Sequence, residues 1–147
     1  MEKKHEISII FFDINNFGVT DKTYGHTVGD IILIEVSKLL RKNTPSDAFL
    51  CRFGGDEFAV LLPAHLDEGT ALAYRLAEII GQHSFIRGIK VSLSAGIVGG
   101  RRHEDRDNDP WSTMEQLINI ASLRSTEAKK SNAILSMADI QGANEIA

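Results

Sequence analysis

The chain has few of the features that mark secreted or membrane-embedded proteins. Its 147 residues include one cysteine, Cys51, so no intramolecular disulfide can form, which fits a reducing compartment. No apolar run approaches the ~20 residues of a membrane helix. The apolar stretch near the N-terminus is too short for a signal peptide. We therefore expect a cytoplasmic protein with no direct membrane insertion.

The chain also lacks an excess of basic residues. Lysine and arginine number 16 against 20 acidic residues, and the net charge is -4. Nucleic-acid binding needs a clustered basic face, so this balance argues against a nucleic-acid partner. A compact anion such as a nucleotide stays possible, because a bound metal ion can supply positive charge.

The hydrophobic pattern predicts one α/β domain with a mixed central sheet flanked by helices. Residues 7–12 are apolar on both faces, which predicts a central buried strand. Asn15, Asn16 and Gly18 then indicate a turn. Further strands are expected at 48–53, 58–62, 89–98 and 134–137, helices at 28–42, 70–80 and 112–130, and an exposed loop at 99–110. We assign 1–137 to the single domain and 138–147 to a polar tail.

Three carboxylates stand at the ends of predicted strands. Asp13 ends the first strand, and Gly54-Gly55-Asp56-Glu57 joins two later strands as a hairpin whose glycines can adopt positive φ. If this hairpin pairs beside the first strand, the carboxylates converge. Mg²⁺ takes such ligands together with substrate phosphates, and two ions can activate a hydroxyl and stabilise a leaving oxygen. The alternative is that Gly54-Gly55-Asp56-Glu57 is only a solvated hairpin turn and that Asp13 is a polar residue at the end of its strand.

Several separated motifs resemble one family. The stretch Arg52–Phe58 contains the Gly-Gly-Asp-Glu-Phe sequence that names the GGDEF family. Residues Phe12–Phe17 and Tyr24–Asp30 resemble its D-I-D-x-F-K-x-I-N-D-x-x-G-H-x-x-G-D signature in type and spacing. Ser92–Ile97 and Ala128-Lys129 are similar to its S-I-G-V strand and to the end of its A-L-Y-x-A-K helix. The resemblance spans about Ile7 to Met137.

The resemblance implies a polymerase-palm/nucleotide-cyclase-like fold and diguanylate cyclase activity. Members condense two GTP molecules into cyclic di-GMP and release pyrophosphate. They use two Mg²⁺ (or Mn²⁺) ions per site and a facing homodimer. Members are commonly joined to sensor domains in longer chains, and the family's N-terminal D-x-L-T-G-L-x-N-R segment is absent here. We therefore expect an excised piece or a shortened member.

The resemblance also implies roles for single residues. The ions would be held by Asp13, the carbonyl of Ile14, Asp56 and Glu57. The catalytic groups would be Asp56 or Glu57, which deprotonates the 3′-hydroxyl, and Lys129, which neutralises phosphate charge. The nucleotide would contact the backbone of Asn16, Phe17 and Gly18, the side chains at Asp21 and Asp30, and the backbone at Gly55.

The chain departs from the family at several of these positions. Gly18 replaces a phosphate-binding Lys, Asp21 replaces an Asn that donates to guanine, and Ala133 replaces an Arg. Pro45-Ser46-Asp47-Ala48 occupies the place of the product-inhibition motif R-x-x-D, so that feedback site is expected to be absent.

Three functions therefore stand side by side. The first is a diguanylate cyclase without product inhibition. The second is a degenerate, non-catalytic module that binds a nucleotide or a protein. The third is a mononucleotide cyclase, against which the intact Gly-Gly-Asp-Glu-Phe hairpin argues.

Overall fold

The computed structural model describes residues 6–101, 110–130 and 135–139. In this part of the chain a five-stranded sheet has the order β2-β3-β1-β4-β5. The strands are β1 (Glu6–Ile14), β2 (Phe49–Arg52), β3 (Glu57–Leu62), β4 (Leu93–Arg101) and β5 (Leu135–Asp139). The helices are α1 (Phe17–Tyr24), α2 (His26–Asn43), α3 (Leu66–Gln82) and α4 (Pro110–Lys130), with a short 3₁₀ turn at Ile86–Gly88.

The sheet is mixed, as predicted. β1 lies in the centre and pairs antiparallel with β3 and β4. β2 pairs antiparallel with β3 to complete the predicted hairpin. β5 lies parallel to β4 at the other edge.

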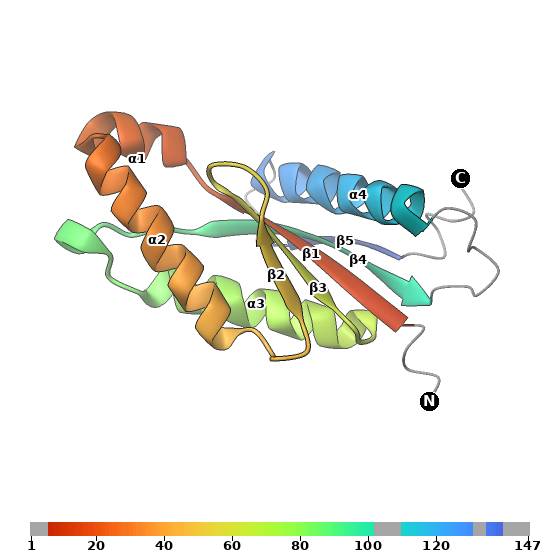
Figure 1. The fold of residues 1–147 in the computed structure, drawn as a ribbon. Coiled ribbons are helices and arrows are strands. Elements are labelled where there is room, and N and C mark those ends of the chain that lie inside the picture. Colours follow the sequence, from red (N-terminus) through yellow and green to blue (C-terminus); the bar gives the residue numbers. More distant parts are fainter. Residues whose placement is uncertain (1–5, 102–109, 131–134, 140–147) are drawn as a thin grey trace.

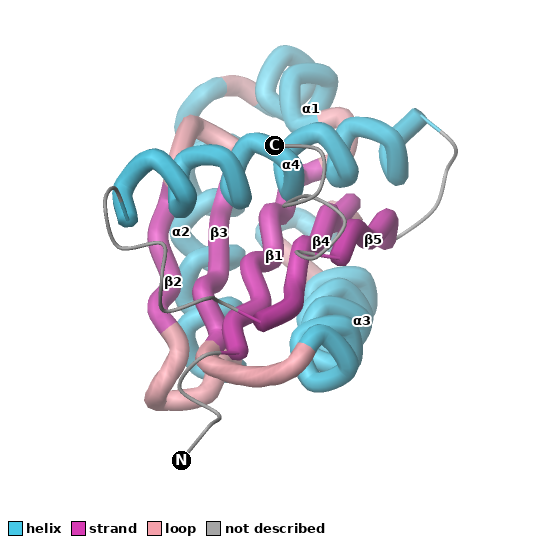
Figure 2. The backbone as a smooth tube through the Cα atoms, turned by 90° about the vertical axis from the view of Figure 1, so that its right-hand side faces the viewer, coloured by secondary structure: helices cyan, strands magenta, loops and turns pink. Residues whose placement is uncertain are grey.

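Helices cover both faces of the sheet, which explains why the middle of β1, from Ile9 to Phe12, is apolar at successive positions. α2 and α3 lie on one face and α4 crosses the other (Figures 1 and 2). The larger core joins Ile10 and Phe12 of β1 to Ile32 of α2 and Leu76 of α3. The smaller core joins Ile9 and Phe11 to Ala121 of α4. A strand buried on both faces must carry apolar residues at successive positions.

The sequence pattern missed or misplaced several elements. Helix α1 begins directly after the predicted turn, and Gly18 lies within it. β4 begins at Leu93 rather than Ile89; residues 89–92, which follow the 3₁₀ turn, belong to no strand. β5 extends to Asp139, beyond the expected start of the tail. Within the predicted loop, Gly99–Arg101 belong to β4 and Pro110 begins α4, while 102–109 lie outside the described residues.

None of the helices in the described ranges combines the length and apolar character that crossing a bilayer requires.

Candidate functional site

The pairing of β1 with β3 brings the predicted carboxylates together. Asp13 stands directly opposite Glu57 in the antiparallel register. The amide of Ile14 donates a hydrogen bond to the Asp56 carbonyl oxygen at 3.1 Å. The prediction that the hairpin pairs beside the first strand is therefore confirmed.

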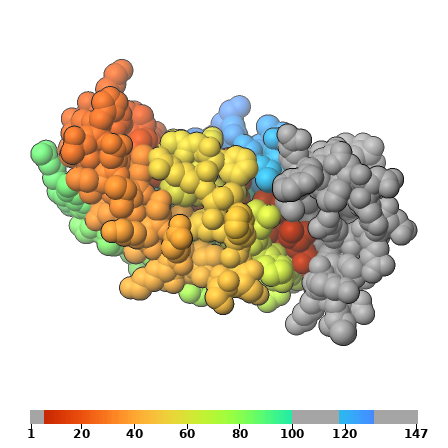
Figure 3. Space-filling model, in the orientation of Figure 1, coloured from red at the N-terminus to blue at the C-terminus, as the bar shows by residue number. Residues whose placement is uncertain are grey.

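The hairpin turn is fixed by its own hydrogen bonds. The Phe53 amide donates to the Glu57 carbonyl at 2.8 Å. Arg52 donates from Nε to the Gly54 carbonyl (3.1 Å) and from Nη2 to the Gly55 carbonyl (2.8 Å). Figure 3 shows the hairpin, in yellow, at the surface beside α2 in orange.

The expected reason for two glycines in this turn was wrong. Positive φ occurs at Gly25 and Gly88, not in the hairpin. A Cβ at Gly54 would instead lie 2.7 Å from Oε1 of Glu57, so that glycine makes room for the carboxylate. Gly55 is exposed, and a Cβ there would meet no other group within 4 Å. Its missing side chain leaves open space at the surface.

Lys129, near the end of α4, reaches the same place. Its Nζ lies 3.0 Å from Oδ2 of Asp13, and the side chains are 39% and 18% exposed. The structure therefore brings together four of the predicted residues: Asp13, Asp56, Glu57 and Lys129.

Burial and neighbouring charge raise the proton affinity of Asp13 and Glu57. Burial raises the pKa of Asp13; the Lys129 ammonium lowers it, and nearby Asp56 raises it again. Burial also raises the pKa of Glu57, and repulsion from Asp13 and Asp56 adds to that shift. One ammonium does not offset the local negative charge, which favours binding of a further cation.

The donor set suits a hard divalent cation. Within the described ranges, no group of three or more His, Cys, Asp and Glu side chains is arranged to hold a metal ion by itself. An ion here would need other oxygen ligands as well, which is how Mg²⁺ is usually bound: one or two carboxylates, with water and substrate phosphates. In the structure the Lys129 ammonium neutralises Asp13 in its place.

The β1–α1 turn lies beside this cluster in the sequence. Asn16 adopts a left-handed conformation (φ 55°, ψ 30°), and no side chain of the described residues caps the N-terminus of α1. The amides of Phe17 and Gly18 therefore belong to the first turn of a helix, whose amides can bind anions.

A hollow lies between α1 and α2. It has a volume of about 720 Å³ and is lined by Gly18, Val19, Asp21, Lys22, Gly25 and His26. Nδ1 of His26 lies 2.7 Å from Oδ2 of Asp21, a pair that the sequence did not suggest. Asp30 is exposed on α2 and does not line this hollow. Position 133 lies outside the described residues.

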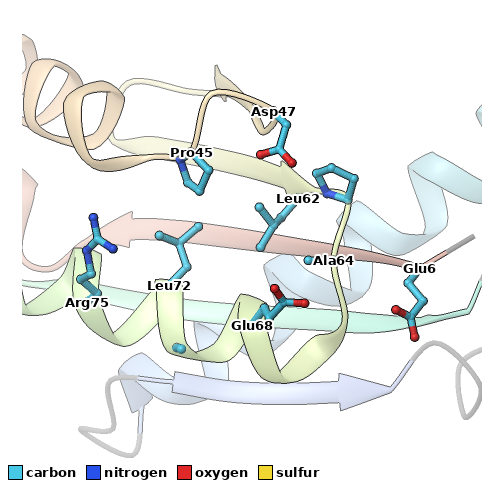
Figure 4. Close-up of a pocket in the computed structure, with 10 residues that line it drawn as sticks. Glu6, Pro45, Asp47, Leu62, Ala64, Glu68, Leu72 and Arg75 are labelled. Carbon is cyan, nitrogen blue, oxygen red and sulfur yellow. The ribbon is translucent and has the colours of Figure 1, made fainter. Parts of the chain in front are cut away.

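A separate hollow lies at the other end of β1, near Glu6 (Figure 4). Leu62 and Leu72 line it together with Arg75, and the acidic residues around it are Glu6, Asp47 and Glu68. Pro45 and Asp47, from the segment that replaces R-x-x-D, also line it.

Asn15 is a polar residue of the site that sequence reasoning passed over. Its side chain bonds to Ser92 and Ser94 at the start of β4. Its position directly after Asp13-Ile14 was the available signal.

Comparisons with known proteins agree with this arrangement. The family model described as "Diguanylate cyclase, GGDEF domain" matches residues 1–135. Diguanylate cyclase A of Treponema denticola is 35% identical over 100 residues, which make up 65% of this chain and 27% of that protein. The bifunctional diguanylate cyclase/cyclic di-GMP phosphodiesterase MucR of Pseudomonas aeruginosa is 35% identical over 105 residues, 66% of this chain and 15% of that protein. The chain thus spans about a quarter or less of these relatives.

A solved structure shares the fold. The active GGEEF domain of a diguanylate cyclase from Vibrio cholerae superposes with a TM-score of 0.78 at 24% identity, covering 90% of this chain and 83% of that one. With the family model matching most of its length, the chain belongs to the GGDEF domain family.

Proposed function

We propose that this domain is a diguanylate cyclase that condenses two GTP molecules into cyclic di-GMP. The observation that carries the proposal is the cluster of Asp13, Asp56 and Glu57 with Lys129. Similarity to named diguanylate cyclases at 35% identity supports the same reaction.

The chemistry assigns a role to each group. Asp13, Asp56 and Glu57, with the Ile14 carbonyl, would hold two Mg²⁺ or Mn²⁺ ions, whose contribution is to polarise the reacting phosphate and stabilise the leaving pyrophosphate. Asp56 or Glu57 would accept the proton of the attacking 3′-hydroxyl.

The remaining residues bind the nucleotide. Lys129 would neutralise phosphate charge as a point cation. The amides of Asn16, Phe17 and Gly18 would bind phosphate oxygens at the start of α1. The open space at Gly55 would let the nucleotide approach the backbone. Asp21 and Asp30 would accept hydrogen bonds from the guanine edge.

Two copies of the domain are needed because the product joins two nucleotides. Each copy would present one GTP to the other. The 3′-oxygen of each GTP forms a bond to the α-phosphorus of the other, the bond to pyrophosphate breaks, and the hydroxyl proton leaves to a carboxylate. Two such steps give one cyclic di-GMP and two pyrophosphates.

The proposal is tested by incubating the chain with GTP and Mg²⁺ and identifying products by mass. Cyclic di-GMP should form with wild type and not with Asp56→Ala. No product, even after fusion to a dimerising helix, would reject the enzymatic function. Formation of a cyclic mononucleotide would favour the mononucleotide cyclase instead.

A second candidate is a degenerate module that binds GTP without turnover. Gly18 removes one phosphate-binding cation. The Asp21 carboxylate lies 2.7 Å from His26 and, when ionised, cannot donate to guanine. Losing a hydrogen bond to a charged group costs about 1.5–3 kcal/mol. Calorimetry distinguishes the cases: GTP binding without product supports this module, and no binding supports a protein-interaction domain.

We further propose that cyclic di-GMP does not inhibit the domain through the R-x-x-D position. Pro45 and Ala48 stand where that motif has its Arg and Asp, and Glu6, Asp47 and Glu68 outnumber Arg75 around the hollow, which disfavours an anionic product. Added cyclic di-GMP should therefore leave turnover unchanged, as long as its concentration is too low to occupy the active site itself.

The surroundings of the domain are proposals too. We propose that residues 1–137 act as one cytoplasmic GGDEF domain and that sensor domains accompany it in a longer natural chain. The small share of MucR that the chain covers supports that architecture.

A further inference from the structure

A hydrogen-bonded chain of uncharged side chains lies behind the carboxylate cluster. The Asn15 amide donates to the Ser92 carbonyl at 2.9 Å, and Asn15 Nδ2 donates to Ser92 Oγ at 2.9 Å. Oδ1 of Asn15 accepts from Ser94 Oγ at 2.7 Å. Three bonds therefore fix the residue that follows Asp13-Ile14 to the start of β4.

The same chain continues to α4. Ser125 Oγ donates to the Ser94 carbonyl oxygen at 3.3 Å, and both serines are 1% exposed. Buried hydroxyls of this kind persist where they are hydrogen-bonded. The chain thus connects β1, β4 and α4, from the half-buried Asn15 to the buried Ser94 and Ser125.

Gly96 allows this close approach. A Cβ on Gly96 would overlap the Ala121 carbonyl oxygen and the Ser125 amide nitrogen, so the backbone of α4 rests directly on β4. Lys129 follows Ser125 by four residues and therefore lies on the same side of α4, one turn later. This places its ammonium on Asp13.

We propose that Asn15, Ser94 and Ser125 are positioning residues that fix the spacing between Asp13 and Lys129 for ion and triphosphate binding. Asn15 holds the end of β1 and, through it, Asp13 and the Ile14 carbonyl. Ser125 holds α4 and, through it, Lys129. The left-handed turn at Asn16 is anchored by the same bonds, because it follows Asn15 directly. The inference rests on the proposed function.

The test uses the full chain and measures Mn²⁺ binding by electron paramagnetic resonance, without GTP turnover. Asn15→Ala and Ser94→Ala should each weaken Mn²⁺ binding about 5- to 20-fold, as expected for losing one or two hydrogen bonds. Ser125→Ala should raise KM for GTP with a smaller effect on Mn²⁺. Thr126→Ala is the matched control, because it removes a hydroxyl of α4 whose bond is local, to the Ser122 carbonyl at 3.2 Å.

A double-mutant cycle tests whether Ser125 acts by positioning Lys129 or only by stabilising the fold. If Ser125 acts by placing Lys129, Ser125→Ala should have little further effect on KM in a Lys129→Met background. The inference would be overturned if Ser125→Ala and Lys129→Met had additive effects on KM. It would also be overturned if Asn15→Ala and Ser94→Ala bound Mn²⁺ as tightly as wild type. If Ser94→Ala does not fold, Ser125→Ala decides, since alanine is the stronger helix former. Wild type that binds Mn²⁺ but makes no cyclic di-GMP would reject the proposed function alone.

Discussion

At the residue scale, the site brings three carboxylates close together. Asp13 and Glu57 face each other across two strands, with Asp56 beside them and the ammonium of Lys129 on Asp13. Like charges directly opposite in a sheet destabilise it by a few tenths to about 1 kcal/mol. Such an arrangement is understandable if a cation binds there.

The first prediction concerns Glu57→Gln. Removing this charge relieves repulsion, so the metal-free domain should gain about 0.2–1 kcal/mol and melt about 1–3 °C higher. Mn²⁺ binding and product formation should be lost at the same time. Thermal unfolding with and without Mn²⁺ measures both. A variant that is less stable than wild type without metal would show that Glu57 is a structural residue.

The second prediction is a pH dependence. The pKa values of Asp13 and Glu57 lie above their ordinary values of 3.8 and 4.5, so the folded state binds protons more tightly than the unfolded state. The stability that comes from this tighter proton binding is present below about pH 4. It is lost as the pH rises through the raised pKa values of the folded state.

The metal-free melting temperature, compared between wild type and Glu57→Gln, should therefore show wild type losing relative stability as pH rises from about 4 toward 7. Saturating Mg²⁺ should remove that loss, because the ion binds the ionised carboxylates. A difference between the two proteins that does not vary with pH would refute the assignment of Glu57 to this cluster.

At the element scale, the close packing of α4 on β4 sets where Lys129 lies. Gly96→Ala should cost about 1–3 kcal/mol, because the new methyl group meets backbone atoms of α4 that cannot move aside. It should also displace Lys129 and weaken GTP binding. Denaturant unfolding and calorimetry measure the two effects.

The matched control is Gly81→Ala on the exposed surface of α3, where a Cβ meets nothing within 4 Å. Alanine should stabilise that helix by up to about 0.5–1 kcal/mol. If Gly96→Ala were equally tolerated, α4 would be able to shift away from β4, which would contradict the close packing.

Elements with strong periodicity could be predicted from the sequence. The buried β1, the hairpin and the amphipathic α2 and α3 follow from apolar spacing, and the convergence of Asp13 with Asp56 and Glu57 follows from pairing the hairpin with β1. Helix α1 could not be found this way, since none of its residues is buried and Gly18 lies in its first turn.

Other features depend on tertiary contacts that no local pattern encodes. The role of Gly96 requires knowing which helix packs on β4. Asp21 pairs with His26 across a turn, and Asn15 bonds to residues 77 and 79 positions later in the sequence. Lys129 was placed through resemblance to the family rather than through its own spacing.

At the scale of the whole molecule, the proposed reaction requires two copies of the site. Because the product needs two nucleotides, the initial rate at low protein concentration should rise with the square of that concentration. Mass-resolved product formation across a hundredfold dilution series measures this order. A strictly first-order rate would mean that the domain is already a stable dimer or that one copy suffices, and sedimentation separates those two cases.

The most direct test of the central claim is a crystal structure with Mn²⁺ and a non-hydrolysable GTP analogue, in which anomalous scattering locates the ions. We predict two Mn²⁺ ions bound by Asp13, the Ile14 carbonyl and the Asp56-Glu57 pair, with phosphate oxygens completing their shells and Lys129 moved from Asp13 to phosphate. An analogue bound elsewhere, or Mn²⁺ absent from these carboxylates at saturating concentration, would contradict the account.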